Sequence, residues 1–135
     1  MLAREIVQEL VQALGRENVL TEQEDLLTYA YDATAAMKHH KPDVVVSPLS
    51  TEQVAEVVKI ANRHHVPIYP RGSGTNLSGG TIPIGGGIVL SMLNLNKILE
   101  VDQDNLTATV QPGLIIQALN DEAAKHGLLL SLIHI

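Results

Sequence analysis

Residues 70–87 read PRGSGTNLSGGTIPIGGG and contain seven of the ten glycines in this 135-residue chain. The same stretch has two of the six prolines and a single charge, Arg71. Glycine loses more conformational freedom on folding than any other residue, so such a dense cluster is costly and needs a structural or functional reason. A flexible linker, a phosphate-binding loop and a tight connection between strands are the alternatives to weigh.

The residues that precede this stretch predict a β-α-β unit. DVVVS (43–47) is a short β-branched run typical of a buried strand, and VPIYP (66–70) is a second one. Between them, Ser50 and Gln53 form a capping box that opens a helix over 51–64. Its inward face is expected to comprise Val54, Val57, Val58 and Ala61. The two strands should be parallel, with a right-handed crossover.

The residues that follow the stretch predict a strand, a hairpin and a helix. GIVLSM (87–92) is the third strand, and ILEVD (98–102) and TATVQ (107–111) alternate well enough to form an antiparallel hairpin. A helix is expected over 114–126, with Leu114, Ala118, Leu119 and Ala123 facing inward. Gly127 suits a left-handed C-terminal cap. The fold class is therefore α+β, with a β-α-β unit followed by an antiparallel hairpin and a helix.

The two ends of the chain are less regular. Residues 2–14 have helical apolar spacing, and Thr21 with Glu24 predicts a capping box for a short helix that runs to about Tyr29. Residues 31–42 are expected to be irregular. The last eight residues, LLLSLIHI, are apolar and without turn signals, which is compatible with a strand that has no evident partner or with a chain that was cut short.

Composition excludes several classes of protein. Hydrophobic residues make up 45% of the chain and charged residues 18%, as in ordinary soluble domains, and no apolar run is long enough for a membrane span. The net charge of −6 argues against nucleic-acid binding. No cysteine is present, and the N-terminus lacks the order of a secretory signal, so a cytoplasmic location is expected.

Acidic residues are absent between Glu56 and Glu100, the window that contains the glycine stretch. The window has four basic residues, Lys59, Arg63, Arg71 and Lys97. This distribution is compatible with an anion near the loop. It is equally compatible with an apolar sheet region that has little room for charge.

The glycine stretch matches neither of the common phosphate-binding motifs. From Gly74 the sequence continues without the lysine of a P-loop, and Leu77 stands where a Rossmann fingerprint needs its third glycine. A loop of small residues between two strands remains, in which backbone N–H groups could form a nest for a pyrophosphate. Gly72, Gly74, Gly79 and Gly80 would permit that backbone, and Ser73, Thr75, Asn76 and Ser78 would add short donors. The alternative is a turn that only links strands.

The ordered motifs VVVSPLSTEQVAEVVKIANRHHVPIYPRGSGTNLSGG and GGIVLSMLNLNKILEVDQDNLTATVQPG resemble the N-terminal half of a PCMH-type FAD-binding domain. This is the domain of the vanillyl-alcohol oxidase / p-cresol methylhydroxylase superfamily, and the likeness is greatest to its glycolate oxidase and D-lactate dehydrogenase branch. It covers about residues 1–128 and includes the Gln111-Pro112-Gly113 turn. The resemblance implies that the loop binds the FAD pyrophosphate through Pro70, Arg71, Gly72, Ser73, Gly74, Thr75, Asn76, Leu77, Ser78, Gly79 and Gly80.

The resemblance also implies an organisation and an activity. Residues 1–41 would be a helical lead-in, 42–128 an incomplete FAD-binding domain, and 129–135 an atypical tail. The full-length enzyme would be an FAD-dependent 2-hydroxy-acid dehydrogenase or oxidase of the glycolate or D-lactate type, with partner oxidoreductase subunits, and this fragment would contain no catalytic residue. The alternative is a stand-alone binding or scaffold domain without activity.

One departure from the family concerns how FAD is held. Members with covalent flavin often use a histidine at the position of Thr75, so FAD should be non-covalent here.

Other constellations are interpreted structurally. Adjacent histidines such as His64 and His65 make poor shared metal sites and are expected to cap the helix over 51–64. Asp102, Asp104 and Asn105 resemble part of a calcium loop, but a hairpin turn uses the same residues. Tyr31-Asp32 is interpreted as packing plus a turn.

Overall fold

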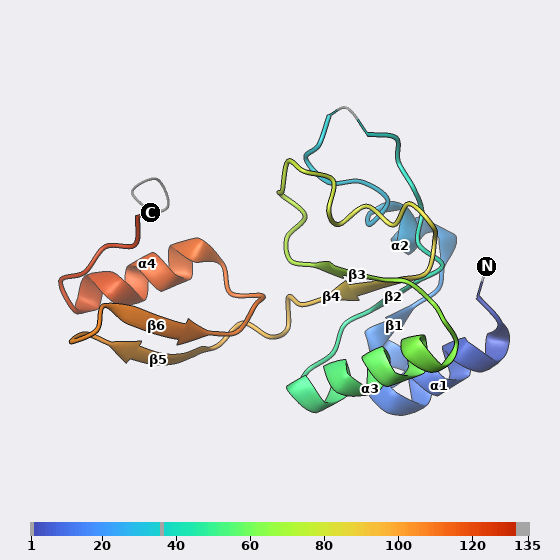
Figure 1. The fold of residues 1–135 in the computed structure, drawn as a ribbon, viewed down its shortest axis with the longest axis horizontal. Coiled ribbons are helices and arrows are strands. Elements are labelled where there is room, and N and C mark those ends of the chain that lie inside the picture. Colours follow the sequence, from blue (N-terminus) through green and yellow to red (C-terminus); the bar gives the residue numbers. More distant parts are fainter. Residues whose placement is uncertain (1, 36, 132–135) are drawn as a thin grey trace. The chain divides into compact units, whose positions relative to one another are not determined.

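The computed structural model describes residues 2–35 and 37–131 and divides the chain into two compact units, residues 1–94 and 95–135 (Figure 1). The first unit contains a four-stranded sheet and three α-helices, and the second contains a hairpin and one helix. The expected α+β class is confirmed. The predicted boundaries at 41/42 and 128/129 stay a prediction.

The sheet of the first unit has the order β1-β2-β4-β3. Its strands are β1 (Val19–Leu20), β2 (Val44–Val46), β3 (Ile68–Arg71) and β4 (Ile88–Ser91). β2 and β3 are parallel, as predicted, but they are not neighbours, because β4 lies between them and pairs in parallel with both. The short β1 pairs antiparallel with β2. The glycine-rich stretch is therefore the connection between two adjacent parallel strands.

The two central strands are buried on both faces because their residues are almost all branched and aliphatic. On one face, Val44 and Val46 pack with the helices α1 (Arg4–Leu14) and α3 (Thr51–Arg63), which Figure 1 shows on the same side of the sheet. On the other face, Val45 packs with residues around the short helix α2 (Gln23–Leu27).

The Ser50 cap of the predicted capping box is confirmed, but the Gln53 side chain bonds to Leu49 rather than back to Ser50. The Ser50 hydroxyl accepts a hydrogen bond from the Gln53 backbone N–H at 3.3 Å, and the Gln53 side chain accepts one from the Leu49 N–H at 2.7 Å. The two histidines lie at the C-terminal end of α3, as predicted. His64 is the C-cap residue, and His65, which follows it, adopts a left-handed conformation with φ 51°. The Val66 N–H then donates to the Ala61 carbonyl, which completes a Schellman motif.

Three expectations for the helices of the first unit are wrong. Thr21 does not cap α2, because the cap position is Glu22 and the Thr21 hydroxyl instead accepts from the Arg16 guanidinium at 3.4 Å. The helix then ends at Leu27 rather than near Tyr29. Val58 is exposed, since it lies about 100° around the helix from the buried Val57. The remainder of the buried face of α3 is formed by Ile60 and Ala61.

The second unit is the predicted hairpin with its helix. β5 (Ile98–Asp102) pairs antiparallel with β6 (Thr107–Val110), and the turn is closed by the Asp102 carboxylate, which accepts from the Asn105 N–H at 2.9 Å. α4 (Ile116–Lys125) begins two residues later than expected, because the Leu114 N–H closes a turn on the Gln111 carbonyl.

No residue described in α4 is fully buried, and Ala118, predicted to face inward, is exposed. The predicted left-handed Gly127 is confirmed, with φ 70° and a Leu128 N–H that donates to the Ala123 carbonyl. Of the segment 128–135, considered as a strand, residues 128–131 have no regular secondary structure and residues 132–135 lie outside the described residues. In the part that is described, no helix is long and apolar enough to cross a membrane.

Candidate functional site

The glycine-rich loop leaves the carboxyl end of β3 and returns to the amino end of β4. Its first part surrounds an open depression of about 420 Å³. The lining residues are Gly72, Ser73, Gly74, Thr75, Asn76, Ser78, Gly80 and Thr81. The carboxyl ends of parallel strands are where ligands bind in open α/β sheets, because loops and side chains converge there.

Backbone N–H groups are the main hydrogen-bond donors around this depression. Within residues 2–35 and 37–131, no acceptor takes a hydrogen bond from the N–H groups of residues 73–78. Six consecutive N–H groups thus have no acceptor among the described residues, and all of these residues except Leu77 line the depression. The Ser73 and Thr75 hydroxyls lie 3.1 Å apart and add polar groups at the same place. Such a set suits an anion with several oxygens.

Two glycines of the loop are required by the backbone. Gly74 has φ 73°, and a Cβ there would come within 2.1 Å of the Arg71 guanidinium. Gly79 has φ 70°, and a Cβ there would meet the Met37 sulfur at 2.0 Å. Both positions combine the left-handed region with a close neighbour, so no other residue fits without displacement.

Gly72 and Gly80 differ from that pair. A Cβ at either position would find no heavy atom within 4 Å, and neither residue has the positive φ that favours glycine. The packing of the chain therefore does not require glycine there. Both residues line the depression, and close approach of a ligand to the backbone is a physical reason for leaving out the side chain.

Arg71 lies beneath the loop rather than in its lining. Its guanidinium is buried, donates to the Tyr31 carbonyl at 2.7 Å and to the Thr81 hydroxyl at 3.4 Å, and faces the Tyr29 ring with 5.5 Å to the centroid. The chain therefore fixes a positive charge close to the depression. Among the other residues predicted for the site, Pro70 and Gly79 also lie outside the lining, as does the exposed Leu77.

Asp32 is a residue of this region that the sequence interpretation missed. Its carboxylate accepts from the Asn76 amide at 2.6 Å, from the Thr81 hydroxyl at 3.1 Å and from the Thr34 N–H at 2.8 Å. Partial burial alone would raise the pKa of Asp32, but these bonds from Thr34, Asn76 and Thr81 outweigh it and lower the pKa to about 2.

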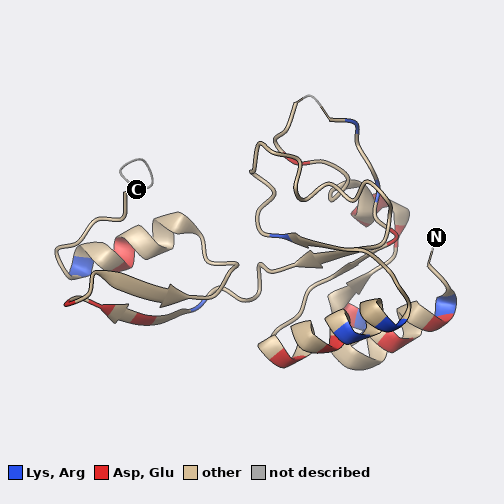
Figure 2. Cartoon of the chain, in the orientation of Figure 1, with Lys and Arg blue, Asp and Glu red and all other residues tan. Residues whose placement is uncertain are grey.

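The sequence of the loop contains no charged residue, but a charged side chain from a distant segment lies next to it. Figure 2 shows no charged residue over 72–87, yet the Asp32 carboxylate reaches the loop from 44 residues before Asn76. The expected turn at Asp32 is confirmed by its bond from Thr34. The remaining signal in the sequence, an aspartate followed by threonine two positions on, is too common to identify a distant partner.

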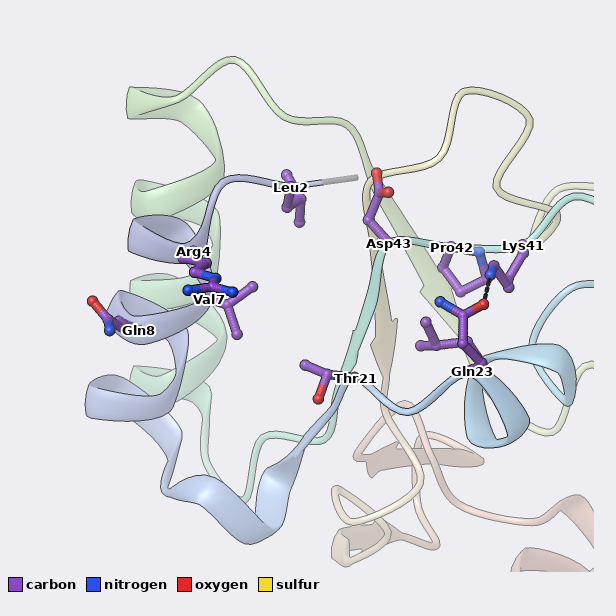
Figure 3. Close-up of a pocket in the computed structure, with 10 residues that line it drawn as sticks. Leu2, Arg4, Val7, Gln8, Thr21, Gln23, Lys41, Pro42 and Asp43 are labelled. Carbon is purple, nitrogen blue, oxygen red and sulfur yellow. Dashed lines mark hydrogen bonds between the residues drawn. The ribbon is translucent and has the colours of Figure 1, made fainter.

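A second depression, of about 370 Å³, lies between α1 and the start of β2 (Figure 3). Its lining is Leu2, Arg4, Val7, Gln8, Thr21, Gln23, Leu26, Lys41, Pro42 and Asp43. Two of its polar groups already pair within the chain: Lys41 donates to the Gln23 side chain, and Asp43 accepts from the Gly87 N–H at 2.8 Å. Among the residues the structure describes, no three acidic or histidine side chains gather in a way that could hold a metal. The loop is the stronger candidate.

The chain also matches a known family of domains. A family described as the FAD binding domain matches residues 42–133. That range includes the whole glycine-rich loop, both parallel strands that it connects, and the hairpin of the second unit.

The chain is also similar to individual proteins and solved structures. Glycolate oxidase subunit GlcD of Bacillus subtilis is 46% identical over 115 residues, which is 85% of this chain and 24% of that protein. D-lactate dehydrogenase of Anaerostipes hadrus is 36% identical over 121 residues, or 90% of this chain and 26% of that protein. Among solved structures, p-cresol methylhydroxylase with substrate bound superposes with a TM-score of 0.80 and 31% identity, and covers 92% of this chain and 25% of that one. The chain thus spans about a quarter of the length of the relatives it matches.

Proposed function

The chain belongs to the family of FAD binding domains, and on that premise we propose that residues 70–80, at the start of the glycine-rich loop, hold the pyrophosphate of FAD. The residues present fit that group. Two linked phosphates present several oxygens and two negative charges, and the loop offers a run of N–H donors with the buried Arg71 guanidinium close by. Thr75 has no imidazole, so the cofactor is held without a covalent bond.

The observation that supports this proposal most is the run of six N–H groups, residues 73–78, that no described residue accepts from. Short hydroxyl side chains flank these donors, and Gly72 and Gly80 leave the backbone bare on both sides of them. A turn that only linked strands would have no need of bare backbone at positions where a side chain fits.

For the whole protein, we propose an FAD-dependent oxidoreductase that acts on a 2-hydroxy acid, on the strength of the relatives named glycolate oxidase and D-lactate dehydrogenase. Bound FAD supplies the two-electron acceptor for such a reaction. The residues of this chain bind and orient the cofactor and exclude water from its phosphates, and the groups that touch the substrate lie elsewhere in the protein. A cytoplasmic location and partner oxidoreductase subunits belong to the same proposal.

The test uses alanine at glycines the fold does not need. Gly72→Ala and Gly80→Ala should leave the unfolding midpoint unchanged, because their Cβ atoms meet open space. Each should weaken FAD binding about tenfold or more, which corresponds to about 1.4 kcal/mol. Binding is measured by titration of flavin fluorescence and by calorimetry. Gly85→Ala is the matched control, since its Cβ would make an ordinary 3.4 Å contact with the Tyr69 hydroxyl and it does not line the depression.

Two results would count against the proposal. Equal FAD affinity in the wild type and both alanine variants would remove the loop from the site. Absence of FAD binding to the whole protein at micromolar concentrations would favour a scaffold domain without a cofactor. A loss of affinity in the Gly85→Ala control would show that the effect is not specific to the lining residues.

A further inference from the structure

The segment that precedes the sheet contacts the glycine-rich loop at several points. Residues 31–35 have no regular secondary structure, yet three of them bond to the loop or to the arginine beneath it. The Tyr31 carbonyl accepts from Arg71, the Asp32 carboxylate accepts from Asn76 and Thr81, and the Thr34 hydroxyl accepts from the Gly79 N–H at 2.8 Å. We propose that Asp32 is a positioning residue that holds the glycine-rich loop in the shape that receives the FAD phosphates.

The geometry explains why an aspartate suits this role. A loop with four glycines over 72–80 has many accessible conformations. Ordering it on binding would cost conformational entropy, and this cost is smaller if the loop is already ordered in the free protein. Asp32 fixes two points of the loop at once, because one carboxylate oxygen receives both the Asn76 amide and the Thr81 hydroxyl. The Asn76 bond is charge-assisted and short, at 2.6 Å.

The chemistry also explains why a carboxylate can lie beside an anion site. A carboxylate close to phosphates is unfavourable unless nearby hydrogen-bond donors or positive charges stabilise its negative charge. Here three donors surround the carboxylate, and the Thr81 hydroxyl links it to the buried Arg71 guanidinium, which donates to the same hydroxyl at 3.4 Å. The donors that would bind phosphate, residues 73–78, are separate from the donors that Asp32 uses, apart from the side chain of Asn76.

Asp32 lies ten positions before the family match, which begins at residue 42. Its role would also bring into the site a segment that was expected to be a separate helical lead-in. The positioning role rests on the proposed function only for the identity of the ligand, because the ordering of the loop by Asp32 can be measured without FAD.

The first experiment is therefore done without cofactor. Asp32→Asn keeps the size of the side chain but turns one acceptor into a donor that faces other donors. We expect the backbone ¹⁵N heteronuclear NOE of residues 73–78 to fall relative to the wild type, and the Asn76 side-chain amide signal to shift. Asp104→Asn, the same change in the turn of the second unit, is the control and should alter neither. Asp32→Glu keeps the charge and should restore part of the NOE.

The second experiment measures FAD affinity in the same variants. If the competent loop conformation falls to about a tenth of the population, the apparent affinity falls about tenfold. Asp32→Asn should show such a loss at an unchanged unfolding midpoint, and Asp104→Asn should show none. If Asp32→Asn does not fold, Asn76→Ala removes the loop-side partner instead and should give the same fall in NOE.

The outcomes separate the two proposals. A looser loop in Asp32→Asn together with a wild type that does not bind FAD would retain the positioning role and overturn the FAD assignment. An unchanged loop would overturn the positioning role whatever the affinities are, and so would tighter FAD binding in Asp32→Asn.

Discussion

The two halves of the glycine-rich stretch are both rich in glycine but differ in their hydrogen bonding. In the second half, every N–H group of residues 82–87 donates within the protein: Ile82 to the Gly79 carbonyl, Ile84 to that of Ile82, Gly85 to the Tyr69 hydroxyl, Gly86 to the Pro83 carbonyl and Gly87 to the Asp43 carboxylate. In the first half, the six N–H groups of residues 73–78 donate to no described residue.

The comparison shows that glycine density alone does not indicate a binding loop. Gly86 and Gly87 have positive φ, and a Cβ there would collide with Asp43 or with the Pro67 carbonyl, so the fold itself requires them. Gly72 and Gly80 have no such neighbours. The part of the stretch for which we propose a ligand is the part whose donors and bare backbone have no use among the described residues.

The largest expected effect is on stability in the second half. Gly87→Ala would place a Cβ 2.5 Å from the Pro67 carbonyl oxygen at φ 87°. The conformational penalty of about 1–2 kcal/mol and the backbone clash together should lower the free energy of unfolding by about 3 kcal/mol or more. Urea unfolding measures it, with Gly85→Ala as the control. A loss below about 0.5 kcal/mol would contradict the account of this half.

Gly74→Ala should combine both kinds of effect. Its positive φ should lower the free energy of unfolding by about 1–2 kcal/mol, and its Cβ would displace the Arg71 guanidinium from the Tyr31 carbonyl. FAD affinity should fall about tenfold or more, because both the backbone and the fixed charge move. Calorimetry on the folded variant measures this, and unchanged affinity would break the distinction between the two halves.

Acid should remove the support that Asp32 gives to the first half. The pKa of Asp32 is about 2 in the folded chain and 3.8 as its ordinary value. The stabilisation is therefore fully present above about pH 4 and is lost as the pH falls towards 2. The difference in unfolding free energy between wild type and Asp32→Asn, measured in urea, should shrink between about pH 5.5 and about pH 2.5. A difference that is constant over this range would contradict the role of the charged form.

The smallest expected effect lies outside the stretch. It tests whether a left-handed backbone conformation is by itself enough to favour glycine. His65 occupies the left-handed cap position after α3, which Gly127 occupies after α4. His65→Gly should therefore stabilise the chain by about 0.5–1 kcal/mol. Thermal unfolding would show a small rise in midpoint, and a fall would mean that the His65 side chain contributes more than its conformation costs.

Local patterns in the sequence predicted local structure well. The Ser50 cap, the Asp102 turn and the Gly127 cap involve residues at most a few positions apart, so their physics is contained in short windows. Periodicity was less reliable where burial depends on a distant partner, as at Val58 and Ala118.

The non-local features could not be predicted. Nothing near β4 in the sequence specifies that it lies between β2 and β3, because parallel pairing depends on segments about 20 and 40 residues away. The same holds for Asp32, whose partners Asn76 and Thr81 lie 44 and 49 positions further on. The loop was predicted as a site from its composition, whereas the hydrogen bonds that connect it to Asp32 are visible only in the structure.

The position of β4 has a consequence for how the molecule folds. β4, one of the two central strands, is the last of the four to be synthesised, so neither parallel pair can form before it is made. The glycine-rich loop connects it to β3, and the entropy cost of closing that loop opposes formation of the β3–β4 pair. A change that stiffens the loop in its native shape should therefore speed refolding as well as tighten ligand binding.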